Sequence, residues 1–96
     1  MIEYLVRPTI SEWFAFSKDS EPYRTIRIPY KEVAGRGTGR FEVDGCEISF
    51  SDEIVGIQVS FWGDMSQLRA DQIIEEIRQA IEAAGQEPAT VVQISW

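Results

Sequence analysis

The fold is decided by residues 66–84, which read SQLRADQIIEEIRQAIEAA. Apolar side chains recur there at intervals of three and four residues, so they fall along one side of a helix. Ser66 or Asp64 can cap the first turn, and Gly85 stands where a left-handed residue commonly ends a helix. We therefore predict a helix over 66–84 that buries one apolar stripe, formed by Ala70, Ile73, Ile74, Ile77, Ala80, Ile81 and Ala84.

The segments on both sides of this helix read as strands, because apolar residues run or alternate there at strand spacing. Ser51-Asp52-Glu53 reads as a turn between two of them. Pro29 marks another as an edge strand or a strand end, since proline cannot donate to a ladder. The predicted extended segments are 2–7, 13–16, 26–30, the hairpin 41–50, 54–62 and 90–96.

The hairpin 41–50 carries the clearest local signal. Its centre, Asp44-Gly45, suits a type I′ turn, which needs two positive φ angles in succession. A two-residue loop gathers the apolar side chains on one side of the ribbon and sets Glu42 opposite Glu47 on the other. Like charges across a pair repel, and Arg40 can soften this repulsion diagonally.

The order of the elements predicts an α+β fold. A twisted sheet of five or six strands packs one face on the single helix, and residues 1–96 form one domain. Short connections favour antiparallel neighbours, so the sheet is mainly antiparallel. The strand–helix–strand unit at the end can add one parallel pair, which would make the sheet mixed.

Composition narrows the class of function. The chain has a net charge of −7, no histidine and one cysteine, Cys46, which is predicted to face the core. Without histidine the usual general base and metal ligand are missing, so we expect no catalytic residue, metal or cofactor. Nucleic-acid binding is disfavoured, because it needs a dominant basic face. We expect no membrane span and no need for an oxidising compartment, hence a cytoplasmic protein.

The tryptophans point to a surface. If the phenylalanines of the strands face the helix, alternation turns Trp13, Trp62 and Ile54 to the other side of the sheet. A helix about 10 Å wide covers only two or three strands at about 4.8 Å spacing. Either the sheet curls until these side chains close over one another, or an apolar patch stays open as a candidate partner-binding site.

The basic residues gather in one region, where residues 23–40 hold five basic groups and one acid. Within it, the glycine-rich segment 35–40 gives a backbone that could wrap an anion, with Lys31, Arg36 and Arg40 as candidate ligands. It matches neither the dinucleotide nor the Walker fingerprint, because a strand follows it rather than a helix. A flexible connection between strands is the simpler interpretation.

Three functions remain open. The first is a small acidic interaction protein that binds a protein partner, and the acidic charge favours a basic one. A bacterial immunity protein against a basic toxin is one concrete form, by analogy of size and charge. The second is an anionic-ligand binder or enzyme that uses the loop 35–40. The third is a structural homodimer that pairs the uncovered sheet faces or an edge strand.

Overall fold

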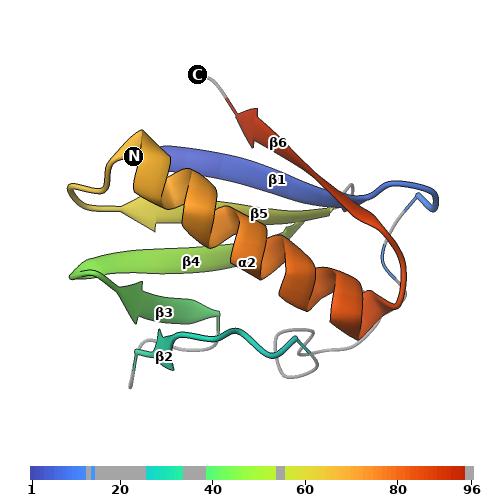
Figure 1. The fold of residues 1–96 in the computed structure, drawn as a ribbon, viewed down its shortest axis with the longest axis horizontal. Coiled ribbons are helices and arrows are strands. Elements are labelled where there is room, and N and C mark those ends of the chain that lie inside the picture. The colour runs from blue at the N-terminus through green and yellow to red at the C-terminus, as the bar shows by residue number, and fades with distance from the viewer. Residues whose placement is uncertain (13, 15–25, 34–38, 54–55, 95–96) are drawn as a thin grey trace.

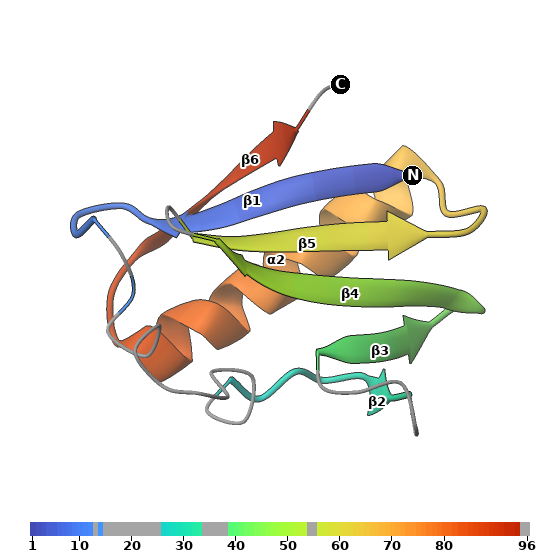
Figure 2. The ribbon, with the colours of Figure 1, turned by 180° about the vertical axis from the view of Figure 1, so that it is seen from behind.

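The computed structural model of the chain describes residues 1–12, 14, 26–33, 39–53 and 56–94. In these residues one open six-stranded sheet carries a single helix on one of its faces (Figures 1 and 2), which confirms the predicted α+β class. The elements are β1 (Ile2–Pro8), β2 (Lys31–Glu32), β3 (Arg40–Val43), β4 (Cys46–Glu53), β5 (Gly56–Trp62), α2 (Gln67–Gly85) and β6 (Ala89–Ile94).

The strands lie in the order β2-β3-β4-β5-β1-β6, and every neighbouring pair is antiparallel. β1 lies between β5 and β6, so that Glu3 stands opposite Ser60 on one side and Ile94 on the other. The N-terminal strand thus separates the two strands that flank the helix. For this reason the parallel pair that the sequence allowed does not form, and the sheet is not mixed.

The predicted hairpin is confirmed. Asp44 and Gly45 have φ angles of 53° and 74°, as a type I′ turn requires, and Val43 faces Cys46 across it. The predicted turn at Ser51-Asp52-Glu53 is wrong, because these residues continue β4 and pair with β5 as far as Gly56. Their polar composition suggested a turn. Polar side chains are compatible with a strand here because one face of β4 is open.

The predicted strand at 26–30 is also wrong. The amide of Ile28 donates to the carbonyl of Ile26 at 3.1 Å, which closes a tight turn instead of extending the chain. Pro29 then lacks the N–H that a ladder would use. Pairing begins only at Lys31, where the two-residue strand β2 joins the edge of β3. The predicted segment 13–16 lies almost wholly outside the described residues, apart from Phe14, which is buried.

The helix α2 follows the predicted apolar stripe. Ser66 caps it, with its hydroxyl accepting the amide of Arg69 at 3.1 Å. Gln86, rather than Gly85, takes the left-handed conformation, because the helix continues through Gly85 and the Gln86 amide closes the last turn on Glu82. In the part of the chain that the structure describes, no helix is long and apolar enough to cross a membrane.

The core lies between α2 and the sheet face beneath it (Figure 1). Two aromatic pairs meet edge to face in it: Tyr4 with Phe61 at 5.6 Å and Phe41 with Phe50 at 5.4 Å between ring centroids. The fully buried side chains of the helix are those that the spacing predicted to face inward. They are Ala70, Ile73, Ile77 and Ile81, with Ile74 nearly so.

We predict that Ile77→Ala lowers the free energy of unfolding by about 2–5 kcal/mol, because it leaves a cavity under the centre of the helix. Chemical denaturation followed by circular dichroism measures this change. Leu68→Ala is the matched control on the same helix, since Leu68 is 71% exposed, and it should cost no more than about 0.5 kcal/mol. Equal losses in the two variants would contradict the burial of this stripe.

Candidate functional site: the second face of the sheet

The two faces of the sheet differ in chemistry. The helix α2 lies over one of them, and among the described elements none lies over the other, which we call the second face (Figure 2). Antiparallel sheets commonly keep one polar face toward water. Strand by strand, the second face carries Arg40 and Glu42; Glu47, Ser49 and Ser51; Gln58, Ser60 and Trp62; Glu3 and Leu5; and Val92 and Ile94.

Trp62 is the largest side chain of the second face. Its indole Nε1 donates to the hydroxyl of Ser49 on β4 at 2.9 Å, and the residue is 45% exposed. The hydrogen bond fixes the orientation of the ring and satisfies its polar atom within the chain. The exposed part of the ring is therefore an oriented apolar surface, of the kind that anchors protein interfaces.

The centre of the second face is polar and closely packed. The hydroxyl of Ser60 donates to Glu3 Oε1 at 3.0 Å, and the two residues are only 7% and 6% exposed. A buried carboxylate needs such donors to offset the loss of its hydration. Strand alternation alone would place Glu3 in water, and the sequence carries no signal for its burial or for its hydrogen bond with Ser60, the residue opposite it on β5.

Two of the three residues predicted to form an apolar patch cannot be compared with the structure. Trp13 and Ile54 lie outside the described residues, so their association with Trp62 stays a prediction. The structure does place Trp62 on the side of β5 that faces away from the helix, as alternation predicted.

Two of the three candidate anion ligands lie on the second face, each beside a carboxylate. Lys31 stands opposite Glu42 in the register of β2 and β3, and Arg40 Nη1 is 3.6 Å from Glu47 Oε1. The predicted diagonal contact of Arg40 across the hairpin is thus present. Any anion at this place competes with both carboxylates. Arg36 lies outside the described residues, so the complete site stays a prediction.

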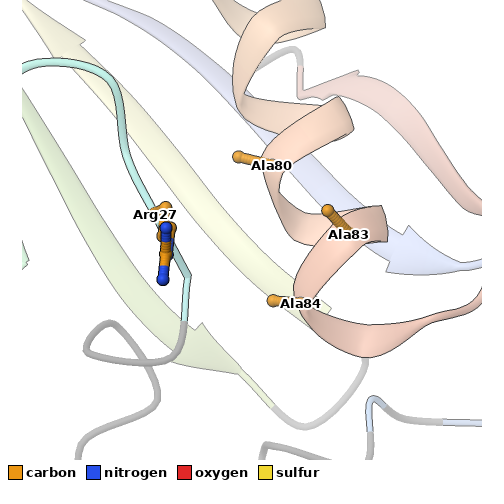
Figure 3. A pocket seen from close by; sticks show the side chains of 4 residues that line it. All are labelled: Arg27, Ala80, Ala83 and Ala84. Carbon is orange, nitrogen blue, oxygen red and sulfur yellow. The ribbon is translucent and has the colours of Figure 1, made fainter.

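A separate cavity of about 310 Å³ opens beside the C-terminal half of α2 (Figure 3). Among the described residues, Arg27, Ala80, Ala83 and Ala84 line this cavity. One cation among small apolar side chains could hold a small anion that has an apolar part. Arg27 is one of the five basic groups of residues 23–40, but no motif in the sequence marks it as a ligand. The signal for the cavity was the cluster of alanines near the end of the helix, where small side chains leave room.

Polar contacts tie α2 to β1 on one side and to the segment before β2 on the other. On the side of β1, the Tyr4 hydroxyl donates to Asp71 Oδ1 at 2.6 Å and accepts from Gln67 Nε2 at 2.9 Å. On the opposite side, the hydroxyl of Tyr30 donates to Glu76 Oε2. These directional contacts fix the rotation of the helix on a core whose hydrophobic contacts are not directional.

The same contacts explain the main pKa shifts. Burial, and then the hydrogen bond to Asp71, raises the pKa of Tyr4, while burial and the bond to Glu76 raise the pKa of Tyr30. The hydrogen bond from Tyr4 in turn lowers the pKa of Asp71. A tyrosine with a raised pKa stays protonated and donates near neutral pH. These two phenols therefore hold the helix in place and are poorly suited to abstract protons.

No metal centre is formed by the residues described here, since none of them gather into a group of three or more acidic, cysteine or histidine side chains that could hold an ion. Comparison with known proteins finds no family model, no curated protein and no solved structure that matches the chain. Among the described residues, the second face with Trp62 is the best-defined surface feature.

We predict that Tyr4→Phe flattens the pH dependence of stability at both extremes. The raised pKa of Tyr4 gives stability that is present below about pH 10 and lost as the pH rises above it. The lowered pKa of Asp71 gives stability that is present above about pH 4 and lost as the pH falls through its folded value. Denaturant midpoints from pH 2 to 11 measure both limbs, and identical profiles for the two proteins would contradict this assignment.

Proposed function

We propose that this chain is a non-enzymatic interaction protein that binds a protein partner through the second face, with Trp62 as the anchor. The observation that supports the proposal is a tryptophan 45% exposed on the sheet face that the helix does not cover. Few interface residues carry most of the energy of binding, and tryptophan is prominent among them. Trp62 is already held by Ser49, so little conformational entropy would be lost when a partner covers it.

The residues around Trp62 are suited to contact a protein partner. Ser49 and Ser60 stand opposite each other on β4 and β5, so small side chains lie beside the ring. Leu5, Val92 and Ile94 add apolar area toward the other edge of the same face. Polar groups around one aromatic anchor are the composition expected of a non-obligate interface.

The charge of the chain favours a particular kind of protein partner. The net charge of −7 favours a basic protein, because opposite charge speeds the encounter of the two. A cytoplasmic immunity protein that neutralises a basic bacterial toxin is the concrete form that we propose, by analogy of size and charge. This form requires that the association rate fall as salt is added.

The cavity beside Arg27 supports a second candidate function, the binding of a small anionic ligand. Arg27 and the three alanine methyls would receive its charged and apolar parts. The loop 35–40 with Lys31 and Arg40 is the other candidate place for such a ligand. Thermal shift against phosphate and small carboxylates tests both, since a ligand at 100 times its Kd adds about 2.7 kcal/mol of stability. Variants Arg27→Ala and Arg40→Ala distinguish the two places.

We predict that Trp62→Ser weakens binding to the partner at least about tenfold, or about 1.4 kcal/mol. The partner is first captured in the source cell by photocrosslinking from a reactive residue placed at the exposed position Ser51 of the second face. Calorimetry with the purified pair then gives Kd for each variant. Leu68→Ser, which removes an exposed apolar side chain on the helix side, should leave Kd within about twofold.

Equal affinities of the Trp62→Ser and wild-type proteins for the captured partner would contradict the proposal. A crosslink only to a second copy of this chain, abolished by Trp62→Ser, would instead favour the homodimer that pairs the second faces. Circular dichroism of both variants shows whether they remain folded.

A further inference from the structure

The two borders of the sheet differ sharply. β2 forms one border with two residues, Lys31 and Glu32, both exposed and charged. β6 forms the other with six residues, and no described strand pairs with its outer side (Figure 1). Natural sheets protect exposed borders with short strands, charges, proline or bulges, because unpaired backbone groups recruit other strands. β2 follows this rule, and β6 does not.

The register shows which backbone groups of β6 are free to pair. The amide of Thr9 donates to the carbonyl of Pro88 at 2.9 Å, which makes these two residues a hydrogen-bonded pair between the chain segments of β1 and β6. Such pairs alternate along an antiparallel ladder, so Thr90, Val92 and Ile94 bond to β1. The amides and carbonyls of the residues between them, Ala89, Val91 and Gln93, therefore point outward.

The side chains of β6 do not discourage pairing either. The strand reads Ala-Thr-Val-Val-Gln-Ile, without charge or proline, in a chain whose net charge is −7. Val92 is 42% exposed and Gln93 is exposed as well. From the helix, the uncharged Gln67 exchanges hydrogen bonds of 2.9 and 3.1 Å with Gln93.

We infer that β6 pairs antiparallel with β6 of a second copy of this chain, so that the two sheets become one. A two-fold axis at Val91 pairs each outward residue with an outward residue: Val91 with its own copy, and Ala89 with Gln93. The same register sets Thr90 against Val92, a favourable β-branched pair. It brings no like charges together within the ladder.

A second copy is the occupant that fits this border because the outward groups of β6 are self-complementary about a two-fold axis, and because the strand carries no charge. Acidic copies of one chain repel each other over most of their surfaces, and the charge-free border is where this repulsion is smallest. The ladder would contain about six backbone hydrogen bonds, two for each of three outward pairs. An interface of this size predicts a reversible dimer that forms as concentration rises.

Sedimentation velocity over a wide concentration range tests the dimer, with Val92→Lys as the disrupting variant. A lysine at this exposed position is the protection that natural borders use. We expect wild-type protein to pass from monomer to dimer, and Val92→Lys to raise the dissociation constant at least about tenfold. Leu68→Lys makes the same charge change on the exposed side of α2 and should dimerise as the wild type does.

Amide hydrogen exchange by NMR at two concentrations provides a second measurement that does not depend on a variant. Dimerisation should slow the exchange of the outward amides of Val91 and Gln93, while those of Thr90 and Val92, already bonded to β1, change little. A strictly monomeric wild-type protein would overturn the inference. So would a dimer that survives Val92→Lys, or one that shows no added protection at Val91.

Discussion

The structure depends on the burial of one isoleucine stripe against one face of one sheet. Ile73, Ile77 and Ile81 are fully buried, and each would lose about 2–5 kcal/mol of stabilisation on truncation to alanine. A helix about 10 Å wide cannot serve both faces of six strands at about 4.8 Å spacing. The side chains of the second face must therefore be compatible with water or with a partner, which is why serines and paired charges surround Trp62 there.

The elements that the sequence predicted well are those whose signal is local. The helix follows from its own periodicity, and the hairpin at Asp44-Gly45 follows from the φ angles that its turn demands. The predictions that were wrong concern segments whose structure depends on neighbouring parts of the chain. The strand predicted at 26–30 had the right alternation but met a tight turn before Pro29, while Ser51-Asp52-Glu53 had a turn composition but found a partner strand in β5. The position of β1 between β5 and β6 has no local signal at all.

The candidate site was predictable to the same extent. The alternation of side chains was enough to predict that Trp62 points away from the helix, because successive side chains of any strand point to opposite faces. Its hydrogen bond to Ser49 and the burial of Glu3 beside Ser60 required knowledge of which strands are adjacent and in which register. The cavity at Arg27 required more, since the described residues that line it come from segments more than 50 residues apart in the sequence. The features of the site that depend on long-range strand pairing are thus the ones that the sequence could not predict.

The central place of β1 has a consequence for how this protein folds. β1 pairs with β5 on one side and β6 on the other, and both of these strands follow β2, β3 and β4 in the sequence. The centre of the sheet therefore forms only when segments far apart in the sequence come together. Contacts of such long sequence separation slow folding. A premature stop before β6 would leave β1 as a bare border of the sheet, exposed to aggregation and to proteolytic quality control.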